Sequence, residues 1–394
     1  MTSMLNCINE PDGPEIIVCC GSGGVGKTTI SAAIGLHGAL SGKKTIVLTI
    51  DPAKRLADSL GLKRFDADAQ RVPIENCIVE KDCPVPDAGL YAMMLDAKRT
   101  FDQLIARYAP SEFQKKIFKN RYYQHLSNNM AGSHEYMAME KLYEIFNQNQ
   151  YDLIVLDTPP SRRALDFLEA PQRMLNILGH NFFMRMFKPY LKAGRWGVRF
   201  LNIFASPVLK GVSKVLGKQA LDDFAGFMQL WDDMMFEGFS RRATAVKELL
   251  AGNKTLFLAV STPQRLPMDE AIFLSKKLLL NEMPFGGFII NRVNFLDSSL
   301  EKRGFDPDKV FENTRIDPGL KEKVIAAHNN ILKMAENDAR SVKRLIDKTG
   351  LEKNVLQIPF ADSEIVGLDD LYRLSRFFYQ IDQKKFDLSD KKNE

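Results

Sequence analysis

A glycine-rich run between an apolar segment and a helical pattern restricts most strongly how this chain can fold. Residues 16–20 are apolar and predict a buried strand, and a helical pattern follows the run. The run fits the phosphate-binding pattern G-x-x-x-x-G-K-[ST], and its residues are Gly21, Ser22, Gly23, Gly24, Val25, Gly26, Lys27 and Thr28. Glycine lets successive backbone N–H groups point at phosphate oxygens, next to the positive end of the following helix. The sequence therefore predicts a nucleotide site here, against the alternative of an ordinary strand-to-helix turn.

Side chains at the end of this run are candidates for contacts with the nucleotide. Lys27 is predicted to neutralise the β- and γ-phosphates, and the Thr28 hydroxyl is predicted to bind Mg²⁺. Thr29 is included with the loop as a nucleotide-binding residue. These residues predict a nucleotide and Mg²⁺ as the ligands.

Short apolar runs recur along the chain and predict buried parallel strands. They lie at 16–20, 45–50, 90–95, 153–156, 255–260, 287–290 and 354–358. Helical patterns separate them, which predicts a doubly wound α/β fold with a mostly parallel sheet and ligands at the carboxyl ends of the strands. Two long stretches without strand patterns predict a helical subdomain inserted around the 153–156 strand. The predicted parts are a P-loop ATPase domain at 1–97, 151–165 and 251–385, a helical subdomain at 98–150 and 166–250, and a polar tail at 386–394.

The bulk composition excludes several other classes of protein. The 394 residues carry a net charge of +5, which by itself predicts no nucleic-acid role. Five scattered cysteines without a CxxC pair predict neither a disulfide framework nor a structural zinc site. Because no leader-like or membrane-spanning stretch is recognised, the chain is expected to be cytoplasmic, or peripheral to a membrane.

Two acidic residues follow predicted strands. Asp51 precedes Pro52, which restricts the backbone after the carboxylate, and is predicted to orient an attacking water. Asp157 is predicted to hold Mg²⁺, often through a water molecule. The alternative for each acid is a helix N-cap after a strand.

Residues near the last two predicted strands are candidates for recognising the base. Asn291 can pair with both N6–H and N7 of adenine. Guanine recognition through an N-K-x-D run needs an acid where this chain has Asn294, so ATP is favoured over GTP. Pro359 and Phe360 are predicted to flank the adenine, with Phe360 as a plain core residue the alternative.

Several motifs together resemble the arsenite-pump ATPases and the related ATPases that escort tail-anchored membrane proteins. They are GSGGVGKTT, DPAKRLADSLG, DTPPSRRALDFLEAP, GSHE at 132–135, VSTP at 260–263, NRV at 291–293, PF at 359–360 and EIVG at 364–367. The resemblance spans most of the chain. It implies a dimeric ATPase whose switch loops relay the state of the nucleotide to helical subdomains. It also implies that Asp51 is the water-orienting acid of switch I and that Asp157 is the acid of switch II.

The chain departs from this family at the second residue of the loop. The family usually has G-K-G-G, and that lysine reaches the phosphates of the partner subunit, whereas this chain has Ser22. The difference implies either a slow homodimer or a heterodimer with a paralogue that supplies the lysine.

Two further departures concern metals and switch II. Neither the arsenite-binding cysteines nor the zinc-binding CxxC of such proteins is found, so no zinc or arsenite site is expected. Switch II has Arg162 and Arg163 where the family has Gly-His. These arginines are either sensors of phosphate or of the partner, or a solvated helix start.

Residues 170–221 contain no Asp or Glu, and their basic residues alternate with Met, Phe and Trp. This composition suits contact with a hydrophobic protein segment or with lipid headgroups. The alternative is the ordinary core face of a helical subdomain. Nucleic acid is disfavoured, because its bases would need exposed aromatic side chains for stacking.

The whole sequence predicts a Mg-ATP-dependent dimeric ATPase that couples hydrolysis to a change in its helical subdomain. The alternative is a nucleotide-gated scaffold with little turnover, in a heterodimer with a paralogue. A small-molecule kinase or ligase would need an acceptor pocket, and none is identifiable.

Overall fold

The computed structural model describes residues 7–8, 10, 12–50, 55–62, 67–76, 88–120, 123–124, 133–158, 236–295, 311, 317–361 and 363–379. The chain divides into two compact units. The first unit comprises Met1–Met93, Tyr151–Ala164 and Gly252–Glu394, and the second comprises Met94–Gln150 and Leu165–Ala251. The predicted tail at 386–394 lies outside the described residues.

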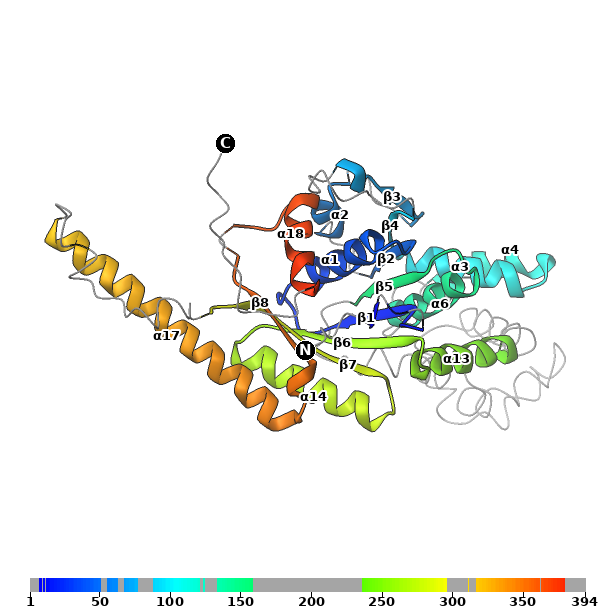
Figure 1. Cartoon of the computed structure of the whole chain (residues 1–394). Coiled ribbons are helices and arrows are strands. Elements are labelled where there is room, and N and C mark those ends of the chain that lie inside the picture. Colours follow the sequence, from blue (N-terminus) through cyan, green and yellow to red (C-terminus); the bar gives the residue numbers. More distant parts are fainter. Residues whose placement is uncertain are drawn as a thin grey trace, which may run out of the picture. The chain divides into compact units, whose positions relative to one another are not determined.

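An eight-stranded sheet forms the centre of the first unit, in the order β3-β4-β2-β5-β1-β6-β7-β8 (Figure 1). The strands are β1 Ile16–Cys20, β2 Thr45–Thr49, β3 Gln70–Val72, β4 Leu90–Met94, β5 Leu153–Asp157, β6 Thr255–Ser261, β7 Phe285–Val293 and β8 Val355–Pro359. The pairs from β2 through β5, β1, β6 and β7 to β8 are parallel, and β3 is antiparallel to β4. The doubly wound, mostly parallel fold predicted from the sequence is confirmed.

All seven predicted strands are present, because each is an apolar run, and the sheet buries the central runs on both faces. Every residue of β1, β2 and β5 is buried. The prediction missed β3, since this edge strand has three residues and only Val72 is buried. A three-residue, largely exposed segment has no apolar pattern to reveal it.

Helices cover both faces of this sheet (Figure 1). Among the described residues of the first unit, the α-helices are α1 Lys27–Leu40, α2 Arg55–Leu60, α14 Arg265–Leu280, α17 Pro318–Thr349 and α18 Gly367–Tyr379. α1 packs against α2, α18 and the strands β2 and β5, while α14 packs against α17, β6 and β7. The strand, loop and helix around the glycine-rich run are therefore held at the middle of the sheet.

The long helix α17 fills a stretch in which the apolar-run pattern predicts no strand. Asp317 caps its start, with its side chain accepting a hydrogen bond from the Leu320 N–H at 3.2 Å, and Pro318 occupies the first turn. Gly350 ends it in a left-handed conformation with φ of 70°. The buried residues of α17 are Ala335, Val342 and Leu345, all in its C-terminal half.

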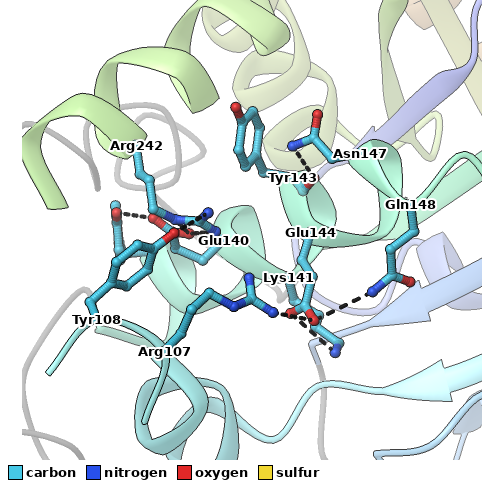
Figure 2. A network of polar contacts seen from close by, with 10 residues as sticks. Arg107, Tyr108, Glu140, Lys141, Tyr143, Glu144, Asn147, Gln148 and Arg242 are labelled. Atoms are coloured by element: carbon cyan, nitrogen blue, oxygen red, sulfur yellow. Dashed lines mark hydrogen bonds and ion pairs between the residues drawn. The ribbon is translucent and has the colours of Figure 1, made fainter. Parts of the chain in front are cut away.

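The second unit is helical in its described residues, with α3 Ala97–Tyr108, α4 Ser111–Lys119, α6 Ser133–Asn147 and α13 Phe236–Ala251. A buried polar network joins three of these helices (Figure 2). Arg242 on α13 donates to Glu140 Oε2 on α6 through Nε at 2.8 Å and through Nη2 at 2.5 Å. Its Nη1 donates to the Tyr108 hydroxyl at the end of α3 at 2.9 Å. Glu140 is 1% exposed, so this pair is a buried ion pair within the unit.

The pKa values of two members of the network, Tyr136 and Arg242, are raised in the folded protein. Burial and then the Glu140 carboxylate raise the pKa of Tyr136, whose hydroxyl donates to Glu140 Oε1. Burial alone would lower the pKa of Arg242, but the Glu140 carboxylate raises it overall. At the outer end of the network, Arg107 lies 3.4 Å from the Glu144 carboxylate and has a side chain 48% exposed. Arg242, which is largely buried, and Arg107, which is half-exposed, therefore have different environments in the same network.

A buried histidine makes the stability of the first unit depend on pH. His37 on α1 meets the edge of Phe378 on α18, with ring centroids 5.8 Å apart. Burial lowers the pKa of His37 from its ordinary 6.5 to about 4. Between these values the unfolded chain binds a proton that the folded chain excludes, so this contribution to stability is complete above pH 6.5 and is lost as the pH falls toward 4.

We expect His37→Leu to reduce the loss of stability that occurs as the pH falls from 7 to 4. Between pH 7 and pH 4 the wild-type free energy of unfolding should fall by up to about 3 kcal/mol more than that of the variant. Urea unfolding at a series of pH values measures this difference. Asn329→Leu, at an exposed position on α17, removes no titratable group, so it is the control and should keep the wild-type profile. Equal acid slopes for wild type and His37→Leu would contradict the assignment.

Candidate nucleotide-binding site

The glycine-rich loop connects β1 to α1, as the sequence predicts. A Cβ at Gly21 would lie 2.2 Å from the Val260 carbonyl oxygen on β6. Gly26 has a left-handed φ of 91°, and a Cβ there would lie 2.4 Å from Nδ2 of Asn291 on β7. Neighbouring strands therefore approach the loop backbone so closely that these two positions require glycine.

Lys27 is the buried cation of this loop. The residue is 6% exposed, and its Nζ donates to the Ser22 carbonyl oxygen at 2.8 Å. The Ser22 hydroxyl is buried and has no hydrogen-bond partner among the described residues. The structure thus places Lys27 against the loop backbone, while Ser22 contributes no charge.

Asp157 ends β5 and brings two threonine hydroxyls together. Its Oδ2 accepts a hydrogen bond from Thr28 Oγ1 at 2.8 Å and from Thr49 Oγ1 at 2.9 Å. The register places Asp157 beside Thr49 of β2 and Cys19 of β1, which explains why these groups meet at the carboxyl edge. Asp157 is fully buried, in agreement with a role inside the site. The sequence analysis assigned no role to Thr49, although that residue lies in the run leading to Asp51.

The oxygen atoms at this point fit a magnesium ion. The Thr28 hydroxyl and the Asp157 carboxylate are hard oxygen ligands, and they already lie within 2.8 Å of each other. When bound, Mg²⁺ would neutralise negative charge on the phosphates. Thr28 would hold the ion directly, and Asp157 would hold its water shell.

The end of β7 contacts the backbone of the loop through two successive residues. Asn291 Nδ2 donates to the Val25 carbonyl at 3.0 Å, and its Oδ1 accepts from the Arg292 N–H at 3.0 Å. Arg292 has a left-handed φ of 61°, and its Nη1 lies 3.4 Å from the Gly24 carbonyl oxygen. The strand register also shifts between Ile290 and Val293. β7 continues to Val293, so Asn291 lies within the strand, and its predicted pairing with adenine stays a prediction.

A cavity of about 680 Å³ opens beside these residues, within the first unit. This volume is in the range of small-ligand pockets. It is lined by the loop and the start of α1, by Thr158, by Asn291 and Arg292, by α2, and by the segment after β8. Phe360 lines the cavity and is 56% exposed, so it is not a core residue. Its predicted contact with adenine, together with Pro359, stays a prediction.

Sequence reasoning assigned no role to some residues that line this cavity. Arg55, Asp58 and Ser59 come from α2, and Glu364 and Val366 come from the segment before α18. The sequence did indicate that these two segments matter, because both belong to motifs on which the family resemblance rests. The local pattern gave no reason to place them at the nucleotide.

Several predicted features lie outside the described residues. They are Asp51, the switch II residues Arg162 and Arg163, the segment 170–221, Cys77 and Cys83. Their predicted roles stay predictions. Among the described residues, Cys19 and Cys20 are buried, and burial raises the pKa of Cys20 to about 12 and that of Cys19 further. Both are therefore neutral thiols, which are poor ligands for soft metals.

Two features are absent from the described residues. No cluster of three or more metal-ligating side chains was found in that part of the chain. None of the helices described is long and apolar enough to cross a membrane.

A parallel sheet with a phosphate-binding loop after β1 and a buried acid at the end of β5 defines a P-loop nucleoside triphosphatase. The sequence matches the anion-transporting ATPase family over residues 14–304, and the chain belongs to that family. It is accordingly an ATP-hydrolysing P-loop ATPase of a family that uses ATP with Mg²⁺. The resemblance identified from the sequence motifs is confirmed.

Individual relatives support the same assignment. A protein of Aquifex aeolicus (strain VF5), provisionally named arsenical pump-driving ATPase 1, is 25% identical over 93% of this chain and 78% of its own length. The ATPase GET3 of Komagataella phaffii is 27% identical over 71% of this chain and 73% of its own. ATPase ASNA1 homolog 1 of Paramecium tetraurelia is 27% identical over 70% of this chain and 74% of its own.

Proposed function

We propose that this ATPase uses Mg-ATP binding and hydrolysis to change the conformation of its helical subdomain, which binds a hydrophobic protein segment or a membrane surface. The contact of Asp157 with Thr28 and Thr49 carries the proposal. Asp157, the acid that we propose senses the metal-phosphate centre, ends β5 eight residues before the chain enters the second unit at Leu165. A shift of this acid on loss of the γ-phosphate would act directly on the start of that unit.

The residues of the site have distinct proposed roles. Lys27 binds the β- and γ-phosphates, and the loop N–H groups and Thr29 complete the phosphate site. Thr28 and Asp157 hold the metal, and Asp51 orients the attacking water. Asn291, Pro359 and Phe360 contact the adenine.

The oligomeric part of the proposal rests on Ser22 and on the family resemblance. The chain acts as a dimer, either with itself or with a paralogue that has a lysine at this position. The Ser22 hydroxyl cannot supply the positive charge with which a lysine at this position would stabilise a partner's phosphates. The homodimer is therefore expected to hydrolyse ATP slowly.

Measurement of ATP turnover and mass in solution tests this proposal. The chain is assayed with Mg-ATP alone, with its closest paralogue from the same source, and with an added apolar helical peptide. Stimulation by the peptide supports coupling to a hydrophobic client, and Lys27→Ala defines the background rate. Turnover that no partner, peptide or lipid vesicle changes would contradict the coupling.

A second function, a nucleotide-gated scaffold, is favoured by the same Ser22. In this case ATP holds the dimer closed and turnover is incidental. Ser22→Lys distinguishes the two: it should raise turnover in a slow ATPase machine. In a scaffold it should change the lifetime of the dimer without making turnover respond to a client.

A further inference from the structure

The outer face of α14 carries three exposed apolar side chains at a constant spacing of seven residues. Leu266 is 67% exposed, Phe273 is 53% exposed and Leu280 is 77% exposed. At about 100° per residue, they form one stripe along the helix. The buried residues of α14 include Met268, Ala271, Ile272, Leu274, Ser275 and Leu278. The stripe lies on the side of the helix opposite to these buried residues, so packing on the sheet does not account for it.

The charges beside this stripe are arranged symmetrically about its central residue. Asp269 and Glu270 lie between Leu266 and Phe273, and Lys276 and Lys277 lie between Phe273 and Leu280. Each acid is as far before Phe273 as one of the lysines is after it. Placing acids early and bases late in a helix also suits the helix dipole, but the dipole gives no reason for an apolar stripe facing solvent.

We propose that α14 binds α14 of a second copy of this chain in an antiparallel pair, with Phe273 on the two-fold axis. An isologous contact places the same helix face of both copies together and runs the helices in opposite directions. Leu266 then meets Leu280 of the second copy, and the two Phe273 rings meet each other. A parallel arrangement would instead align like charges.

The charges set the register of this pair. Glu270 of one copy faces Lys277 of the other, because both lie on the same flank of the stripe and a two-fold axis between antiparallel helices brings the same flanks together; neither side chain has an ion-pair partner in the part of the chain that the structure describes. Asp269 faces Lys276 in the same way on the other flank, although Asp269 is already held by Arg344 at 2.5 Å. Exposed ion pairs stabilise an association by about 0.2 to 1 kcal/mol each. They therefore determine the relative orientation of the two helices, while the apolar stripe provides most of the affinity.

The interface is small and lies away from the nucleotide. Three apolar side chains from each copy bury less than the roughly 1,200 Å² of a stable complex, so the association is expected to be weak and dependent on concentration. α14 does not line the nucleotide cavity. This pairing is therefore expected without nucleotide, and it goes beyond the proposed ATPase dimer.

Sedimentation of the full chain over a range of concentrations, without nucleotide, tests the pairing. Wild type should self-associate, and Phe273→Glu should raise the dissociation constant about tenfold or more. Leu279→Glu is the matched control: Leu279 is also 53% exposed on α14 but lies ~120° from the stripe. It should keep wild-type association. A monomer at every concentration, or equal effects of both variants, would overturn the proposal.

Two further variants test the register itself. Glu270→Lys should weaken association, and Glu270→Lys combined with Lys277→Glu should restore it, because the double exchange recreates the pair between copies. Phe273→Cys should form a disulfide-linked dimer under mild oxidation, whereas Leu279→Cys and wild type, which share the native cysteines, should not. Failure of both the charge rescue and the crosslink would overturn the antiparallel register.

Discussion

Replacing Lys27 with alanine is expected to abolish ATP turnover and to weaken nucleotide binding strongly. The side chain is 6% exposed and belongs to the loop that lines the nucleotide cavity. A hydrogen bond to a charged group contributes about 1.5 to 3 kcal/mol, so the loss of Lys27 should lower affinity by roughly 10- to 150-fold. Titration calorimetry with a non-hydrolysable ATP analogue measures binding, and phosphate release measures turnover.

The control and the comparison variant make this prediction specific. Lys343→Ala removes an exposed lysine from α17 and should change neither quantity. Asp51→Asn should keep nucleotide binding and lose turnover, because an acid that orients water acts on the chemical step. If Asp51→Asn lost as much affinity as Lys27→Ala, the role assigned to Asp51 would be wrong.

Removal of the buried arginine of the second unit is expected to be among the most destabilising single substitutions in this chain. Arg242→Ala would leave the Glu140 carboxylate, 1% exposed, without its charged partner. Breaking a buried ion pair in this way costs about 3 to 5 kcal/mol. Urea unfolding followed by circular dichroism should show this loss.

Two variants separate the buried charge from general effects of truncation. Arg107→Ala removes the half-exposed arginine of the same network (Figure 2) and should cost less than about 1 kcal/mol. Arg242→Met combined with Glu140→Gln should recover part of the lost stability, since no charge then stays buried. Equal losses for Arg107→Ala and Arg242→Ala would show that burial of this pair does not matter.

The fold was predictable because its signals are local. Each long strand is an apolar run that a parallel sheet buries on both faces, and the loop at 21–28 has its own pattern of glycines. The edge strand β3 and the cavity-lining residues of α2 were missed. The three residues of β3 have no apolar pattern, and the motif that contains α2 does not by itself show that its residues lie at the nucleotide, so only the neighbours of both segments in space give them a position.

The sequence by itself determined the class of fold, the phosphate-binding loop with Lys27 and Thr28, and the family. Only the tertiary structure decided which distant groups meet. Thr28 and Asp157 are 129 residues apart yet share a hydrogen bond, and Asn291 reaches Val25 across 266 residues. Such pairs depend on the order of strands in the sheet, which makes β5 and β6 the neighbours of β1. The period of apolar residues and the spacing of glycines each extend over only a few residues. They therefore predict where a strand lies in the sequence, but not which strand lies beside it in the sheet.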